Sequence, residues 1–248
     1  MTRESAVSEV IGYVIILGIV FIVFGLIFFN ATALFTDTEE TESLQNAQRG
    51  FTVLQSNVDE VVFGDSLRRT TQLRLRGGSV AVGGERTRTV LKVDGEVVRN
   101  RTLSPIIYES GNGNVSYDNG AVFRGSVTSV GMASEPDWVV RDKLVSVPSV
   151  RTFGGGSVGG DGTVSVMTES IGDGFVFSND SVSTVNVTVT SQNSPAWNRY
   201  MRDLKEQDDS FTIDRVTQPS ENSVRIDMTL DPDQRFLYTE EPVRVRLR

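Results

Sequence analysis

Cysteine and histidine are both absent from the 248 residues of the sequence. Without cysteine there is no disulfide and no thiolate chemistry, and without histidine the chain lacks the commonest general base and transition-metal ligand. A Ser-His-Asp triad is therefore excluded, although residues 155–159 match the Gly-x-Ser-x-Gly pattern of a hydrolase nucleophile elbow. The sequence also contains no P-loop motif. We expect no catalytic residue, no cofactor and no metal site, and hence no enzyme.

Lysine is scarce as well, since the 24 basic residues include lysine only at positions 92, 143 and 205. The net charge is −8. An acidic chain that prefers arginine suits the surface of a protein from a halophile, although GC-rich codon usage gives the same bias. Arginines alternate along several strand candidates, and we interpret them as the solvent side of half-buried strands. Nucleic acid is therefore not an expected partner.

A long uncharged run, by contrast, begins close to the N-terminus. Val10–Phe29 spans twenty residues without a charge, about 30 Å as a helix, which is enough to cross a bilayer core. The run is longer than the apolar region of a secretory signal peptide, and residues 30–32 make a poor cleavage site. We therefore predict a leader over 1–6 and a retained transmembrane helix over 7–30. Because Arg3 is the only basic residue before the run, we expect a cytoplasmic N-terminus and an extracellular bulk.

The residues around this boundary resemble a known family. The letters RESA at 3–6 and VSEVIG at 7–12 are similar to the class III signal of archaeal type IV pilins and archaellins, and the following run resembles haloarchaeal pilin-like surface proteins. The resemblance implies a prepilin peptidase-like enzyme that cuts between Ala6 and Val7. It also implies that Glu9 pairs with the free amine of a neighbouring subunit, so that copies assemble as homo- or hetero-oligomers through the N-terminal helix.

Apolar residues then recur at spacings of three and four, as in a helix with one apolar stripe. We predict an amphipathic stalk helix over 31–65, continuous with the membrane half because no proline interrupts it. The stripe is expected to pack on the β-domain of the same chain, on neighbouring copies, or on both. Its members are Leu44, Ala47, Phe51, Leu54, Val58 and Val61.

From Arg69 onward the apolar period changes to two, which is typical of strands. Asp94-Gly95 and Asn119-Gly120 are type I′ hairpin signals, and Ser194 followed by proline predicts one short helix. Residues 154–162 read as a flexible glycine-rich loop. The expected fold class is α+β, in which the long N-terminal helix precedes a mostly antiparallel, β-sandwich-like extracellular domain over 66–248.

Glycosylation sequons are the other motif of the β-region. Among the five sequons, Asn100, Asn114 and Asn179 lie nearest to expected turns and are the predicted acceptors. Asn186 falls inside a strand candidate, and Asn30 lies next to the apolar run.

Together these features predict a membrane-anchored, externally facing, type IV pilin-like structural protein, a minor subunit of a surface filament. Two alternatives stay open. The first is a non-polymerising single-span protein with a binding or envelope role. The second is an ectoenzyme that works through carboxylates alone, which requires two convergent acids in a cleft. Acid pairs at 208–209, 231/233 and 240–241 are a separate matter: they are of a type that holds calcium loosely, but none has EF-hand spacing, and we interpret them as solvated surface charge.

Overall fold

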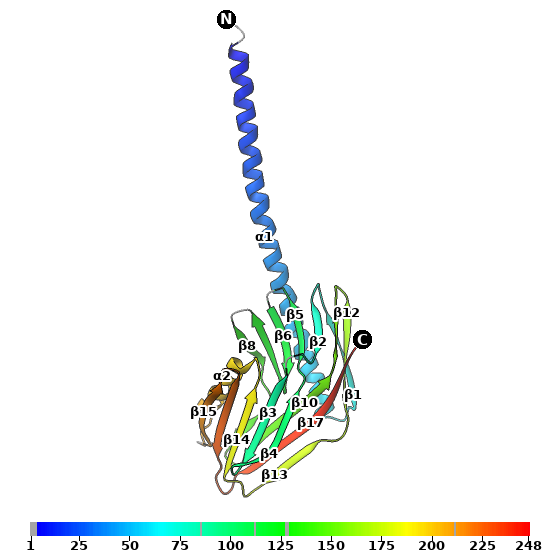
Figure 1. The fold of residues 1–248 in the computed structure, drawn as a ribbon, viewed down its shortest axis with the longest axis vertical. Coiled ribbons are helices and arrows are strands. Elements are labelled where there is room, and N and C mark those ends of the chain that lie inside the picture. Colours follow the sequence, from blue (N-terminus) through cyan, green and yellow to red (C-terminus); the bar gives the residue numbers. More distant parts are fainter. Residues whose placement is uncertain (1–3, 85, 112, 127–128, 211) are drawn as a thin grey trace. The chain divides into compact units, whose positions relative to one another are not determined.

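The computed structural model describes the backbone of residues 4–84, 86–111, 113–126, 129–210 and 212–248 (Figure 1). In the first helix, side chains are described over 12–25 and from residue 42 onward. The chain divides into two compact units, Met1–Glu42 and Ser43–Arg248, which are considered separately below.

Helix α1 covers Glu4–Val62 and contains no proline. Within the residues that the structure describes, no helical stretch is both long and apolar enough to cross a membrane. This finding corrects the transmembrane helix expected over 7–30 and the single-pass membrane localisation that depended on it. An uninterrupted apolar run is compatible with a helix whether or not that helix crosses a membrane. The described part of the run is helical but does not meet the requirements of a membrane span.

The last turns of α1 belong to the unit Ser43–Arg248 and carry the apolar stripe. Phe51, Leu54 and Val58 are fully buried, and Leu44 packs against the same core. Their partners in this core come from β-strands of the same chain, among them Leu73 and Val166. The stripe therefore packs on its own β-domain, as the first of the expected alternatives states.

The strands form three sheets. The first contains β1 (Arg68–Arg74), β12 (Thr163–Ser170), β17 (Arg235–Leu247), β10 (Leu144–Gly154) and β9 (Val139–Arg141), with β13 (Phe175–Asn179) also on β17. The second contains β11 (Gly156–Gly159), β2 (Ser79–Val82), β5 (Ile106–Ser110), β6 (Gly113–Asp118), β7 (Ala121–Ser126) and β8 (Val130–Ser134). The third contains β15 (Ile213–Ser220), β16 (Ser223–Thr229), β14 (Thr184–Thr190), β3 (Thr87–Val93) and β4 (Glu96–Leu103).

The fold is thus mostly β, and the expected α+β class is wrong. The described residues contain seventeen strands against two helices. The buried stripe of α1 supplies one side of a core whose remainder is sheet, so the helix is an addition to a β architecture. The β-rich character expected from the period-two sequence is confirmed.

Strand β17 organises the first sheet. It runs parallel to β10 along the whole of β10, and it pairs antiparallel with β12 over 243–247 and with β13 over 236–240. Among the strand pairs described, β10–β17 is the parallel one. A parallel pair requires a long connection, and the chain between β10 and β17 builds most of the third sheet.

The two expected hairpin turns are confirmed. Asp94 and Asn119 both have positive φ, as do the glycines that follow them, and they join β3 to β4 and β6 to β7. Type I′ turns require positive φ at both central positions, which asparagine, aspartate and glycine tolerate best.

The glycine-rich stretch 154–162 is not a free loop. Gly156–Gly159 forms β11 and pairs with β2. At Gly154 a Cβ atom would collide with the carbonyl oxygen of Val245, so the glycine permits the close approach of two backbones. The glycine-rich composition predicted a flexible loop. The backbone nevertheless pairs with β2, although the side chains of β11 are exposed and bury little surface.

Helix α2 spans Ser194–Glu206 and buries Trp197, Tyr200 and Met201 against the third sheet and β8. Its N-cap is Asn193, without a side-chain cap bond. Ser194, the expected cap, instead donates its hydroxyl to the carbonyl of Glu221. The helix therefore starts one residue earlier than the capping signal indicated.

Candidate functional site

The described part of the first unit is an apolar segment over residues 12–25 of α1, and its large side chains are exposed. Between 44% and 71% of each remains accessible: Tyr13, Val14, Ile15, Ile16, Leu17, Ile19, Val20, Phe21, Ile22, Val23 and Phe24. Consecutive positions are exposed, so the apolar surface surrounds the helix. A soluble helix normally has one polar face, and one that is apolar on every side is normally buried on every side.

Glycines interrupt this apolar segment at positions 12, 18 and 25. A Cβ atom added at any of them meets nothing within 4 Å. Gly18 and Gly25 lie seven residues apart, which places them on one helix face. Small residues on a helix allow another helix to approach closely, so this face is the natural place for a neighbouring helix.

The residues expected to act in processing and assembly are Ala6, Val7 and Glu9. Their side chains lie outside those that the structure describes. The cut after Ala6 and the pairing of Glu9 therefore stay predictions.

The predicted glycosylation sites differ in their surroundings. Asn179 is exposed at the end of β13, and its side-chain oxygen accepts from the Ser181 amide. Asn100 is exposed on β4, with its oxygen bonded to Arg88. Asn114 is half-buried on β6 beside two cavities. Modification at the three sites stays a prediction, and Asn179 has the most accessible geometry.

Of the two sequons set aside, Asn186 donates its amide nitrogen to Asp227 at 2.6 Å. That bond occupies the nitrogen to which a glycan would be attached. The side chain of Asn30 lies outside the described residues.

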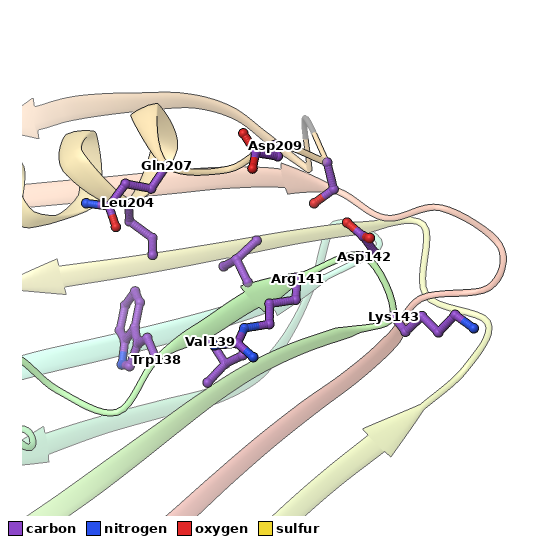
Figure 2. Close-up of a pocket in the computed structure, with 10 residues that line it drawn as sticks. Trp138, Val139, Arg141, Asp142, Lys143, Leu204, Gln207 and Asp209 are labelled. Atoms are coloured by element: carbon purple, nitrogen blue, oxygen red, sulfur yellow. The ribbon is translucent and has the colours of Figure 1, made fainter.

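A second candidate site is a cavity of about 690 Å³ between β9 and the C-terminal end of α2 (Figure 2). We refer to it as the α2 cavity. It is lined by Trp138, Val139, Val140, Arg141, Asp142, Lys143, Leu204, Gln207, Asp209 and Ser210. Figure 2 shows Trp138 and Leu204 at one end of the cavity, Asp142 at the other, and the Lys143 amine directed away from both.

Two buried polar side chains hold the walls of the α2 cavity in place. Asp208 accepts hydrogen bonds from the amides of Ser210 and Ile213, at 3.2 and 2.6 Å, and thereby fixes the loop after α2. Gln234 donates to the carbonyl of Arg141 and to Thr212, which links the β9 side of the cavity to the α2 side. The cavity is therefore preformed by internal bonds.

The charged groups of the α2 cavity are unpaired. Within the described part of the chain, the side chains of Arg141, Asp142 and Asp209 form no hydrogen bond and no ion pair. Trp138 is 7% exposed, and its indole nitrogen is buried without a hydrogen-bond partner. Because that nitrogen is itself enclosed, it does not open into the cavity, and Trp138 contributes ring surface to the lining.

Little in the sequence indicated this cavity. Asp208-Asp209 was interpreted as solvated acid, but Asp208 is buried and structural. Trp138 and Arg141 come from a segment without a motif. The one available signal was tryptophan close to several charges of both signs, which is common on protein surfaces and carries little information.

The acid pair 240–241 contains a buried carboxylate that is bonded to arginines, so the interpretation of this pair as solvated charge is wrong for Glu240. Glu240 accepts from Arg99 at 2.7 and 3.2 Å and lies 3.4 Å from Arg151. Arg99 also stacks on Phe175, 4.3 Å from the ring centre. Because Arg99 is on β4 and Glu240 on β17, the bonds join the first and third sheets. Removing one member of a buried ion pair typically costs about 3–5 kcal/mol, so the role of Glu240 is structural.

Two further carboxyl groups have displaced pKa values. Burial, and after it the nearby Asp137 carboxylate, raises the pKa of Asp59 to about 7. Burial raises the pKa of Asp118 to about 6, while hydrogen bonds from Thr87 and Ser191 oppose the rise. Neither residue lines the α2 cavity. No cluster of three or more acids able to hold a metal occurs among the described residues.

Two comparisons with known proteins bear on this chain. An uncharacterized protein of Archaeoglobus fulgidus is 29% identical over 79 residues, which cover 32% of this chain and 26% of that protein. The stretch is short relative to both proteins and suggests no function. The sequence model of a family of unknown function matches residues 5–246, which takes in helix α1 and every strand up to most of β17. The chain therefore belongs to the family of unknown function DUF7289.

Proposed function

We propose that this protein is a non-enzymatic structural subunit with the layout of a type IV pilin, and that copies assemble through the apolar segment of α1. The observation that carries the proposal is the ring of exposed apolar side chains over residues 12–25. The resemblance of residues 3–30 to archaeal pilins supports it.

The occupant of this surface is a set of further copies of the same segment. Fully burying one large apolar side chain contributes about 1.5–3 kcal/mol. About half of each of these side chains is still exposed, so association buries about half of that amount per side chain. Summed over the segment, the gain is comparable to the ~4–15 kcal/mol that association costs. One neighbour covers only one face, so this gain is reached only when several copies surround each helix. No charge opposes such contact, because the run Val10–Phe29 contains none.

Processing belongs to the same proposal. A prepilin peptidase-like enzyme cuts between Ala6 and Val7 and exposes a new amine. In the assembly, Glu9 of one copy pairs with the Val7 amine of another, because a carboxylate enclosed by apolar helices requires a cationic partner. The mass of the protein isolated from its own cells should correspond to a chain that starts at Val7. A chain that retains residues 1–6 in assembled material would contradict this step.

A pair of matched substitutions on one helix tests the assembly. Ile19 in the apolar segment is 55% exposed, and Val53 further along α1 is 54% exposed. Ile19→Glu places a charge where copies meet, whereas Val53→Glu does not. Filaments are sheared from cells that express each full-length variant and are examined by electron microscopy and immunoblotting. We expect Ile19→Glu to reduce the filament fraction by at least about tenfold, equivalent to about 1.4 kcal/mol, and Val53→Glu to match the wild type.

Two outcomes would overturn the proposal. In the first, the two variants assemble equally well. In the second, the wild-type protein is recovered only as single copies bound to lipid, so that lipid and not a further copy covers the segment.

A further inference from the structure

We propose that the α2 cavity binds a neutral saccharide. The inference goes beyond the structural role proposed above and does not depend on it, because every residue involved belongs to the unit Ser43–Arg248.

The size of the cavity suits a small ligand. Its volume of about 690 Å³ lies inside the roughly 300–1,000 Å³ range of small-molecule sites. The bonds made by Asp208 and Gln234 hold its walls in the absence of a ligand, so little ordering is required on binding.

The charges that line the cavity favour a ligand that both donates and accepts hydrogen bonds. Asp142 and Asp209 only accept, whereas Arg141 only donates, and none of the three has a partner within the described chain. With two acids and two bases among its lining residues, the cavity has no net charge that would favour an anion or a cation. A hydroxyl group serves both kinds of residue at once. A polyhydroxylated neutral ligand therefore satisfies the set.

The opposite end of the cavity has apolar walls, which a sugar ring also requires. Leu204 and Val140 present apolar surface that suits the C–H face of a sugar ring, and Trp138 forms the wall beside Leu204 (Figure 2). Trp138 contributes the apolar surface of its ring, because its indole nitrogen is enclosed and does not open into the cavity. Apolar walls with a few convergent polar groups are typical of small-molecule sites.

Tryptophan fluorescence provides a direct assay. The chain has two tryptophans, and both report on this site, because the rings of Trp138 and Trp197 lie 5.7 Å apart. Full-length protein is titrated with maltose, cellobiose, lactose and trehalose, and heats of binding are measured in parallel. For at least one sugar we expect a saturable change with a dissociation constant of about 0.1–10 mM.

Three variants locate the binding. Asp209→Asn and Arg141→Gln each remove a charge that faces the cavity, and each should weaken binding by about tenfold or more. Asp233→Asn removes an exposed acid outside the cavity and should bind as the wild type does. The thermal unfolding midpoint of each variant checks that the fold is intact.

The inference is wrong if none of the four sugars gives a saturable signal at 50 mM, a ceiling of about five times the weakest expected constant. It is equally wrong if both cavity variants bind with unchanged affinity, because the sugar then binds elsewhere. Tighter binding of glucuronate or glucosamine than of every neutral sugar would show that the cavity selects charge, and would also overturn it.

Discussion

Helix α1 contains two apolar stretches that have opposite environments. In the stripe between Leu44 and Val61, apolar residues recur every three or four positions and are covered by strands of the same chain. Over residues 12–25, apolar residues occupy nearly every position and remain exposed. A stripe requires one partner surface, which this chain supplies. A helix that is apolar on all sides requires apolar partners on all sides, and the described part of the chain supplies none for residues 12–25.

The largest expected contrast concerns one phenylalanine from each stretch. Phe51 is fully buried, whereas Phe24 is 69% exposed. Phe51→Ala should lower the free energy of unfolding by about 3–5 kcal/mol, because it leaves a cavity in the core. Phe24→Ala should change it by less than about 0.5 kcal/mol. Urea unfolding of the two full-length variants measures both values. Similar losses in the two would show that the apolar segment is already packed within a single copy.

Glycine-to-alanine substitutions sharpen the same contrast. At Gly50 a new Cβ atom would lie 2.7 Å from the Leu73 side chain, whereas at Gly18 it meets nothing within 4 Å. Gly50→Ala should cost about 1–2 kcal/mol in urea unfolding, because crowding in the core outweighs the gain in helix propensity. Gly18→Ala should leave unfolding unchanged or slightly improved and reduce the yield of sheared filaments. A stable Gly50→Ala protein would show that Leu73 moves aside at no cost.

The smallest effect depends on pH and concerns Asp59, in the covered stretch. Its raised pKa of about 7 means that the folded state keeps a proton which the unfolded chain has lost above about pH 4. The free energy of unfolding should therefore fall as pH rises from 4 to 7. In Asp59→Asn, the free energy of unfolding should depend less steeply on pH. Above pH 7 it should exceed the wild-type value by on the order of 1 kcal/mol, after allowance for solvent screening.

A control for the pH experiment comes from Asp118. Its pKa of about 6 has the same direction of shift, so its contribution falls between pH 4 and 6 in both proteins. The variant curve should consequently flatten mainly between pH 6 and 7. An unchanged slope in that window would show that Asp59 is not the group that titrates there.

Local signals in the sequence predicted local structure well. The stripe found the buried face of α1, and Asp94-Gly95 and Asn119-Gly120 found their hairpins, because spacing and backbone preference act over a few residues. The parallel pairing of β10 with β17 left no such trace, since it joins segments far apart in the chain. Residues 154–162 misled because glycine weakens a strand without preventing backbone pairing.

The α2 cavity and the fold class were missed for related reasons. Trp138 and Asp209 line the same cavity, whose two walls are held by the bonds of Asp208 and Gln234. No pattern along the chain encodes that arrangement. The α+β expectation treated the long helix as a separate structural layer, whereas its buried stripe covers one side of a core that is otherwise built from sheet. The membrane span was inferred from hydropathy alone, which registers the need for apolar surroundings but does not distinguish lipid from protein.

The position of β17 in the first sheet has a consequence for the order in which the protein is made. Val243 and Val245 share a core with Phe51 and Leu54, so the buried stripe of α1 is covered by a strand that is made long after it. Until then the buried stripe of α1 lacks part of its cover, and β10, β12 and β13 lack their common partner. Contacts this distant in sequence form slowly, and partly folded chains with exposed apolar surface aggregate. The sheet that covers the stripe of α1 is therefore complete only once β17 has been made, so we expect the unit Ser43–Arg248 to fold after β17 is available rather than segment by segment.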